Sequence, residues 1–196
     1  MISAIAACGA HNLLLFGPPG TGKSLLASRL PSILPAMSEQ QALEVASIQS
    51  IAGEPIAWQQ RPFRQPHHSC SSVAMVGGGA QPSPGEVSLA HHGVLFLDEL
   101  PEFSRQLLDM LREPMETGQI NIARAAWQAT FPAQFQLIAA MNPTNSNHID
   151  AAAIDRRYLK KLSRPLLDRI DMYVEVANLP AELLHKQNQG ETSQSV

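Results

Sequence analysis

A glycine-rich turn near the start of the sequence carries the residues best suited to chemistry. Residues 17–24 read GPPGTGKS and match the pattern G-x-x-x-x-G-K-[ST] in full. Glycines let successive backbone N–H groups converge on a polyphosphate, and the dipole of a following helix adds positive charge. The pattern predicts that ATP and Mg²⁺ bind here, with the lysine at the β- and γ-phosphates and the serine hydroxyl on the metal ion. The nucleotide-binding residues so predicted are Gly17, Pro18, Pro19, Gly20, Thr21, Gly22, Lys23 and Ser24.

The segments on either side of the turn favour this interpretation over a chance turn of glycines and prolines. An apolar run, Leu13–Phe16, precedes the turn, and Leu25, Leu26 and Leu30 follow it with helical spacing. A phosphate loop requires a strand before it and a helix after it, and both are indicated here.

Two acidic residues lie near the end of a second apolar run, VLFLDEL at 94–100. In open α/β sheets, ligands bind at the carboxyl ends of the strands. We therefore expect Asp98 to hold Mg²⁺ and Glu99 to polarise the attacking water. The alternative is a strand that ends in solvated acids without a catalytic role.

A third apolar run, FQLIAAMN at 135–142, ends in an amide. We expect the side chain of Asn142 to orient the water or to touch the γ-phosphate. The alternative is a turn residue that precedes Pro143.

The segment LSRPLLDRID at 162–171 supplies two arginines, Arg164 and Arg169. A guanidinium aimed at the developing charge accelerates phosphoryl transfer, and a neighbouring subunit often supplies it. The alternative is an ordinary ion pair with Asp168 or Asp171.

Two pairs of adjacent histidines, at 67–68 and 91–92, do not predict a metal site. Adjacent residues in regular structure point apart, and no third ligand type clusters with either pair.

Apolar runs that alternate with helical patterns predict an α/β fold, in which helices cover both faces of a parallel sheet. The expected strands lie at 12–17, 94–100, 135–142 and 172–176, with a further strand within 61–93. Ser38 and Gln41 are expected to form a capping box at the start of a helix, and Ser104 to cap another helix that Pro114 kinks or ends.

Two insertions are expected in this sheet. From Lys23 to Asp98 the chain is longer than one βαβ unit needs, so the segment 61–93 should hold an inserted loop or hairpin. A second hairpin is expected at 118–132, with Ala125 and Ala126 near its tip.

The composition is that of an ordinary globular chain. It has 196 residues, 44% of them hydrophobic, and a formal net charge of −3. This charge gives no overall electrostatic case for nucleic acid, so any DNA contact must come from a local patch. Two cysteines suggest neither a disulfide framework nor a metal site. Without a membrane-spanning run or a secretory signal, the cytoplasm is the expected compartment.

Together these segments resemble the AAA+ ATPases of the magnesium-chelatase-like family. They cover most of residues 9–177 and are far more specific than a phosphate loop alone. The matching strings include HNLLLFGPPGTGKSLLASRLPSILP, PFRQPHHS, PGEVSLAHHGVLFLDELPEFSRQLLDMLREPMETGQINIARA, FPAQFQLIAAMNP and PLLDRIDMYVEV.

The resemblance implies a P-loop AAA+ core of five parallel strands between helices, assembled as a hexameric ring. It places two inserted β-hairpins, within 70–88 and 118–132, at the central pore. It also implies that Asp98, Glu99 and Asn142 keep the roles given above. Arg169, rather than Arg164, is then the finger that reaches the nucleotide of the next subunit.

The string LAHHGVLFLDELPEFSR is similar to the branch of this family that contains DNA branch-migration helicases of natural transformation. DNA is therefore the expected partner, and no membrane is expected. Arg124 and Trp127 flank the tip of the second hairpin, where a guanidinium can meet phosphate and an indole can stack on a base. The alternative for Trp127 is a place in the core beneath the hairpin.

Two other functions stay open. ATPase subunits that drive metal insertion into a porphyrin share the implied fold. They also contain a segment similar to RPLLDR of this chain. A nucleotide-binding fragment without turnover is the other alternative.

The family pattern also implies domain limits. Residues 1–177 are expected to form the ATPase core, truncated on its N-terminal side, and 178–196 a polar tail where a helical lid would begin. The lid, the segment that usually lines the adenine pocket, and a cysteine-containing stretch after MNP are expected to be absent. Ring hydrolysis needs contact between subunits, so the chain alone is expected to be mostly monomeric, to bind Mg-ATP weakly and to turn it over negligibly.

Overall fold

The computed structural model describes residues 2–79, 81–124, 127–142 and 162–178. The expected hairpin tip at Ala125 and Ala126 and the polar tail from 179 onward lie outside the described residues.

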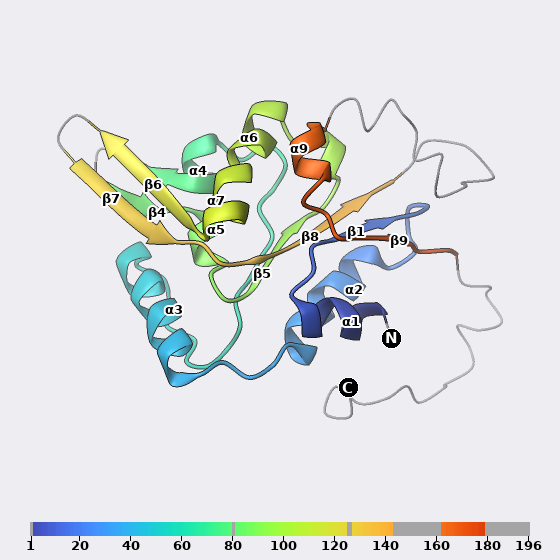
Figure 1. The fold of residues 1–196 in the computed structure, drawn as a ribbon, viewed down its shortest axis with the longest axis horizontal. Helices are drawn as coiled ribbons and strands as arrows, with labels where there is room; N and C mark the ends of the chain where they lie inside the picture. The colour runs from blue at the N-terminus through green and yellow to red at the C-terminus, as the bar shows by residue number, and fades with distance from the viewer. Residues whose placement is uncertain (1, 80, 125–126, 143–161, 179–196) are drawn as a thin grey trace.

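A sheet of five parallel strands forms the centre of the fold (Figure 1). The strands stand in the order β2-β5-β8-β1-β9, and every neighbouring pair is parallel. The prediction of an α/β fold around a five-stranded parallel sheet is therefore confirmed. The strand bounds are β1 Leu13–Phe16, β2 Phe63–Arg64, β5 Val94–Leu97, β8 Gln136–Met141 and β9 Met172–Glu175.

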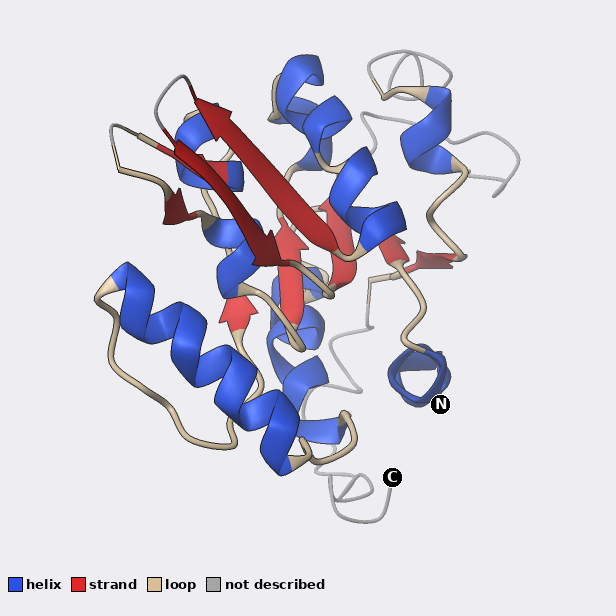
Figure 2. Ribbon diagram, turned by 60° about the vertical axis from the view of Figure 1, so that its left-hand side comes forward, coloured by secondary structure: helices blue, strands red, loops and turns tan. Residues whose placement is uncertain are grey.

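Helices cover both faces of the sheet (Figure 2), because its central strands are apolar on both sides. Leu13 and Leu15 of β1 pack with α1 (Ile2–Gly9) and α2 (Lys23–Arg29), which the 3-10 helix η1 (Leu30–Ile33) follows. Leu14 and Phe16 belong to the core on the other face. That core is completed by α4 (Ser72–Val76), α5 (Glu86–Leu89), the 3-10 helix η2 (Leu100–Glu102), α6 (Arg105–Met110), α7 (Arg112–Thr117) and α9 (Arg164–Leu167).

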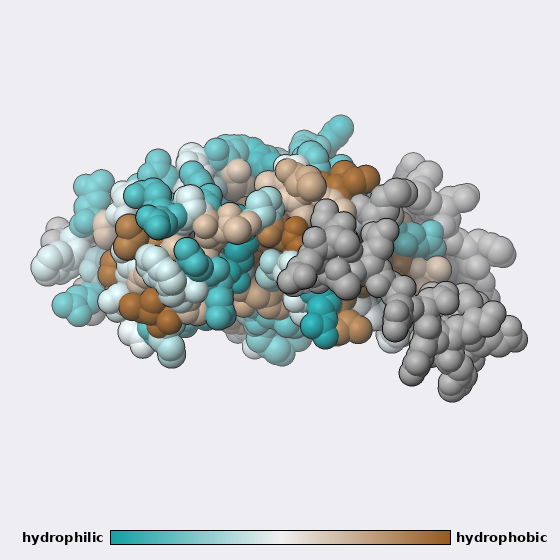
Figure 3. Space-filling view, turned by 90° about the horizontal axis from the view of Figure 1, so that it is seen from below, coloured by the Kyte–Doolittle hydropathy of each residue, from teal (hydrophilic) through white to brown (hydrophobic). Residues whose placement is uncertain are grey.

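Helix α3 (Glu39–Ala52) begins with the predicted capping box. The Oγ atom of Ser38 accepts the backbone N–H of Gln41 at 3.2 Å, and Oε1 of Gln41 accepts the backbone N–H of Ser38 at 3.1 Å. These two bonds satisfy amide groups that the start of a helix otherwise leaves unpaired. The side of α3 that faces away from the core carries Leu43 and Ile51 among polar residues. In Figure 3 the apolar side chains of this region appear as separate patches.

Pro114 explains why the helical pattern at 105–117 is split in two. Helix α6 ends at Met110, and α7 starts at Arg112. A proline ring collides with the carbonyl of the residue four positions earlier, which is Met110 here. The prediction that Pro114 kinks or ends the helix is therefore confirmed, as is the cap by Ser104, whose Oγ accepts the N–H of Leu107 at 3.3 Å.

Both expected insertions contain a hairpin. The short one pairs β3 (Gly77–Gly78) with β4 (Ser83–Pro84), and the long one pairs β6 (Gln119–Arg124) with β7 (Trp127–Pro132). Figure 2 shows the long hairpin outside the central sheet, and Ile120, Ile122 and Phe131 anchor it in the core. The two hairpins touch at Gly77, where an added Cβ atom would lie 3.0 Å from Cδ1 of Ile122. The same Cβ atom would lie only 2.4 Å from the backbone oxygen of Ser83. Only glycine fits there.

Across the described ranges, no helix combines the length and the apolar sequence that crossing a membrane requires.

Candidate functional site

A cleft of about 340 Å³ lies over the glycine-rich loop, at the carboxyl edge of the sheet. Its walls come from the ends of three strands: the loop after β1, the acids after β5 and the amide after β8. The structure thus brings together most of the predicted site. The lining residues are Pro19, Gly20, Thr21, Gly22, Lys23, Ser24, Leu25, Asp98, Glu99 and Asn142.

Gly20 and Gly22 give the loop its backbone path. Their φ angles are 80° and 86°, in the left-handed region that favours glycine. A Cβ atom at either position would meet no atom within 4 Å, so the backbone conformation rather than crowding requires glycine. Turns of this kind aim consecutive N–H groups to one side and form a concavity for anions.

The ammonium group of Lys23 lies inside the loop, and the residue is only 6% exposed. Its Nζ donates to the carbonyl oxygens of Gly17 and Pro18 at 2.8 and 2.7 Å and to Oγ1 of Thr21 at 3.3 Å. Burial lowers the pKa of Lys23, and the charge of Asp98 opposes this shift. Carbonyl groups solvate the ammonium without neutralising it, so an anionic phosphate is the partner that would offset the cost of its burial.

Ser24 and Asp98 meet although 74 residues separate them, and the Ser24 hydroxyl donates to Oδ2 of Asp98 at 2.7 Å. Hydroxyl and carboxylate oxygens are ligands that Mg²⁺ accepts, and neighbouring ligands in its octahedral shell lie about 2.9 Å apart. The spacing therefore fits Mg²⁺, whose remaining positions phosphate oxygens and water would fill. Oδ1 of Asp98 accepts the backbone N–H of Glu99 at 3.0 Å, which orients the carboxylate.

Glu99 stands beside the cleft in an unusual backbone conformation. Its φ of 53° lies in a region that residues other than glycine rarely adopt, and such strain is concentrated at functional sites. Its Oε2 lies 3.4 Å from Nδ1 of His68, whose ring packs edge-on against Phe103. A hollow of about 220 Å³ on this side is lined by both Glu99 and His68. Sequence reasoning missed His68, because nothing in its spacing from Glu99 signals that the two side chains meet.

Asn142 directly follows β8, lines the cleft and is exposed. Because β8 lies between β1 and β5, the amide stands between the phosphate loop and the two acids. Pro143 lies outside the described residues, so the interpretation of Asn142 as a turn residue stays open.

Arg169 lies away from the cleft of its own chain. Its backbone carbonyl accepts Nδ2 of Asn12 at 2.9 Å, at the amino end of β1, whereas the phosphate loop follows the carboxyl end. At about 3.3 Å per residue, Asn12 and Gly17, which flank the two ends of β1, are about 16 Å apart. Arg164 is exposed at the start of α9, and neither arginine lines the phosphate cleft.

The long hairpin pairs Arg124 with Trp127 at its outer end. Trp127 is 58% exposed, so the alternative that it packs beneath the hairpin is wrong.

A profile of the family described as "Magnesium chelatase, subunit ChlI" matches residues 2–184. The chain belongs to this family.

Two curated proteins are similar to this ChlI-family chain over nearly its whole length. The uncharacterized protein YifB of Salmonella typhimurium is 54% identical over 98% of this chain and 40% of YifB. Competence protein ComM of Haemophilus influenzae is 52% identical over 98% of this chain and 40% of ComM. The chain therefore spans about two fifths of the length of these relatives.

The fold is similar to that of NtrX from Brucella abortus, whose crystal structure was solved in complex with ADP. The TM-score is 0.60 at 15% identity, over 90% of this chain and 34% of that chain. The likeness concerns the fold alone, and it agrees with the α/β core predicted for this ChlI-family member.

A third polar residue joins the histidine pair at 91–92, contrary to the expectation from sequence. Oε2 of Glu44, on α3, lies 3.2 Å from Nε2 of His91 and 2.8 Å from Nε2 of His92, close enough for a three-ligand cluster. The expectation that no further ligand type clusters with the pair is therefore wrong. The fold places α3 beside the turn before β5, and no local sequence pattern predicts that Glu44 meets the two histidines.

Hydrogen bonding nevertheless makes this cluster a poor metal site. Nδ1 of His91 accepts the backbone N–H of Gln134 at 3.0 Å, so neutral His91 carries its proton on Nε2 and donates it to Glu44. A metal-binding histidine needs the reverse arrangement, with the ligating nitrogen unprotonated and the other one donating. The cluster instead ties α3 to the base of the long hairpin.

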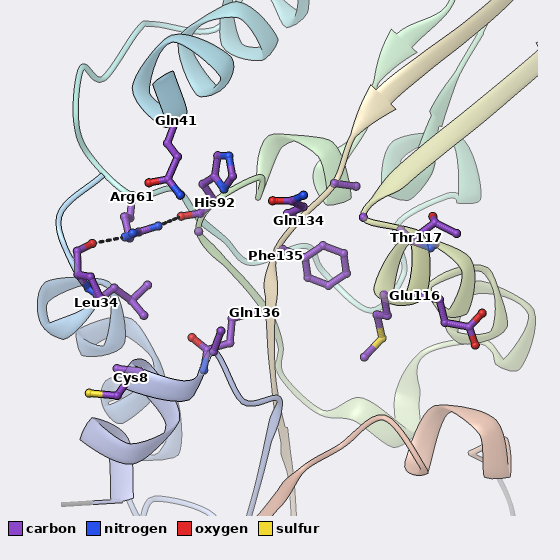
Figure 4. A pocket seen from close by; sticks show the side chains of 18 residues that line it. Cys8, Leu34, Gln41, Arg61, His92, Glu116, Thr117, Gln134, Phe135 and Gln136 are labelled. Carbon is purple, nitrogen blue, oxygen red and sulfur yellow. Dashed lines mark hydrogen bonds between the residues drawn. The ribbon is translucent and has the colours of Figure 1, made fainter. Parts of the chain in front are cut away.

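A larger cavity, of about 540 Å³, lies at the opposite, amino edge of the sheet (Figure 4). Arg61 reaches into its wall and donates to the backbone oxygens of Pro35 and His92 at 2.7 and 2.5 Å. Gln136 and Glu116 also line this cavity, whereas no residue of the phosphate loop does. The cavity is therefore separate from the phosphate cleft.

We expect the fold to lose stability between pH 7 and pH 5 because His91 resists protonation. Burial, and next the charge of His92, lower the pKa of His91 to about 4, whereas histidine in an unfolded chain titrates near 6.5. The unfolded state alone gains the proton in this window, which costs the fold about 2 kcal/mol at pH 5. His91→Asn keeps an acceptor for the N–H of Gln134 but has no titrating ring. This variant should therefore lose about 2 kcal/mol less unfolding free energy between pH 7 and pH 5 than the parent chain. Denaturant titrations at both pH values measure it, and an equal loss in both proteins would contradict the assignment.

Proposed function

We propose that this chain is the ATP-binding core of a Mg²⁺-dependent AAA+ motor that acts on DNA, as a branch-migration helicase in natural transformation. The observation that carries the nucleotide role is the bond between Ser24 and Asp98, formed in one cleft with Lys23 and Glu99. In a chance glycine turn, nothing would place the serine hydroxyl 2.7 Å from a carboxylate that follows another strand, 74 residues away. That distance is close to the one expected between two ligands of the same Mg²⁺ ion.

In this proposal, each polar group of the cleft has one task. The loop amides and Lys23 bind the β- and γ-phosphates. Ser24 and Asp98 hold Mg²⁺, which neutralises charge on the phosphate oxygens when it is bound. Glu99 polarises the attacking water, with His68 beside its carboxylate, and Asn142 orients the water or the γ-phosphate.

The arginine finger is proposed to act between subunits. Arg169 is anchored at the amino end of β1, about 16 Å from the loop of its own chain, so its guanidinium serves the nucleotide of the next subunit. This arrangement requires assembly, and we propose a hexameric ring in the cytoplasm. The core is taken as residues 1–177.

Similarity to competence protein ComM and the exposed Trp127 on the long hairpin support DNA as the partner. The family description favours a second candidate, a chelatase-type subunit that drives metal insertion into a porphyrin. Turnover measured with branched DNA and with a chelatase partner separates the two. Stimulation by the chelatase partner alone would overturn the DNA role.

Lys23→Ala should weaken nucleotide binding, because it removes a charge-assisted contact to the phosphates. Such a contact contributes about 1.5–3 kcal/mol, so the Kd should rise about ten- to a hundredfold. Titration with a fluorescent ATP analogue measures the change. Arg29→Ala is the matched control, since Arg29 is exposed in the last turn of the same helix. If Lys23→Ala and the parent chain bound the ATP analogue with equal affinity, the phosphate-loop assignment would be wrong.

Glu99→Gln should keep ATP bound and slow its hydrolysis at least about a hundredfold, the usual size of a general-base effect. The amide retains the shape of the side chain and loses the ability to take a proton from water. Single-turnover hydrolysis in a version of this sequence that carries the lid measures the rate. Glu102→Gln, an exposed acid in η2, is the control. Turnover that survives in Glu99→Gln would assign the role to another residue, and no turnover in the parent protein would leave a nucleotide-binding fragment.

Arg124→Ala should weaken DNA binding and reduce its salt dependence, while ATP affinity stays unchanged. Each lost phosphate contact lowers the slope of log K against log salt by about 0.7–0.9. Binding of labelled DNA at several salt concentrations, with the lid-containing protein, measures the slope. Arg105→Ala removes an exposed cation from α6 and should leave the slope as it was. An unchanged slope in Arg124→Ala would count against this contact.

A further inference from the structure

Glu116 on α7 contacts the guanidinium of Arg169, the arginine to which the proposed function gives the role of a finger. Oε1 of Glu116 pairs with Nη2 of Arg169, and Nη1 of Arg169 donates to the backbone oxygen of Pro165 at 2.5 Å. The two side chains are 53% and 23% exposed, so the pair lies at the surface of the subunit.

The backbone of Arg169 is fixed independently of this pair. Nδ2 of Asn12 donates to its carbonyl oxygen at 2.9 Å, and Oδ1 of Asn12 accepts the N–H of Leu137 at 2.8 Å. The main chain at 169 is thereby attached to the edge of the sheet. The direction of its long side chain therefore depends on what holds the guanidinium.

The contacts leave part of the guanidinium available. Each terminal nitrogen carries two N–H groups, and within the described part of the chain Nη1 contacts Pro165 and Nη2 contacts Glu116. One N–H on each terminal nitrogen can then serve a phosphate of another subunit. Glu116 therefore orients the group rather than occupying it.

We propose that Glu116 is a positioning residue for Arg169, and that it links this arginine to the base of the long hairpin. Glu116 lies in the last turn of α7, and β6 begins three residues later at Gln119. Figure 4 shows its side chain leaving α7 on the side away from Gln134 and Gln136. A displacement of the hairpin base moves the carboxylate and, through it, the finger. This inference rests on the proposed role of Arg169.

Glu116→Gln should lower kcat about ten- to a hundredfold and leave KM for ATP within about twofold, because a misdirected finger acts on the transition state of a neighbour. The matched control is Glu113→Gln, on the same helix, where the carboxylate meets Asn121 instead. A half-exposed ion pair adds little to stability, so both variants are expected to fold, and thermal melts check this. In an Arg169→Ala background, Glu116→Gln should have no further effect.

Mixed rings test the direction of the effect in the lid-containing protein. Glu116→Gln subunits keep an intact cleft, and Glu99→Gln subunits keep an intact finger. In a mixed ring, a Glu99→Gln subunit supplies its finger to the cleft of a Glu116→Gln neighbour, so turnover per Glu116→Gln subunit should rise. The control is the double variant Glu99→Gln/Arg169→Ala, which has no finger to supply and should not raise that turnover. Slow turnover that no neighbour rescues would place the fault in the subunit's own cleft and overturn this inference, as would an unchanged kcat. Full activity of Arg169→Ala would instead overturn the proposed finger, which the inference presupposes.

Discussion

The parallel register of three strands is the constraint on which the site depends. Phe16 of β1 stands opposite Met141 of β8, and Leu97 of β5 stands opposite Ala139. The strands consequently end close together along one edge, and the loop, the acids and the amide that follow them open into the same cleft. The bond between Ser24 and Asp98 reaches across the end of β8, since β1 and β5 are not neighbours. A slip of one residue would move a strand end by about 3.3 Å and exchange its two buried faces.

A side chain at the opposite edge stabilises this register. Oδ1 of Asn12 accepts the N–H of Leu137 at the start of β8, and the backbone N–H of Asn12 donates to Oδ2 of Asp171 at 2.7 Å, just before β9. Asn12, directly before β1, thus joins the amino ends of three adjacent strands. The bond to Leu137 is partly buried, so it also removes the cost of leaving that N–H unpaired. The alignment that the cleft requires is therefore maintained from both ends.

Local chemistry made much of the fold and of the cleft predictable from sequence. The strands are short apolar runs bounded by polar residues or glycine, and the capping box of α3 and the break at Pro114 depend on residues at most four positions apart. The phosphate loop is similarly local. Only its meeting with Asp98 is long-range, and the rule that parallel strands bind ligands at their carboxyl ends supplies that contact.

The contacts that sequence reasoning missed are those that only tertiary packing sets. Glu44 reaches His91 across 47 residues, and His68 reaches Glu99 from a loop after a strand of two residues. Neither contact has a periodicity or a motif. The direction of each side chain depends on neighbours from other elements, such as the ring of Phe103 against His68. Such residues become visible only when the elements are in place.

The two ends of β1 belong, in the proposed mechanism, to two different catalytic centres. The carboxyl end carries the phosphate loop of one subunit, and the amino end, through Asn12, holds Arg169 for the nucleotide of the next. A strand of four residues separates them, so in this mechanism a shift of the sheet on nucleotide binding would reach the proposed finger without a hinge. The contact with Glu116 would add a second input to the same arginine, from the hairpin base. In the proposed ring, nucleotide state and hairpin position would then act on one guanidinium, which is what coupling hydrolysis to movement of a bound strand would require.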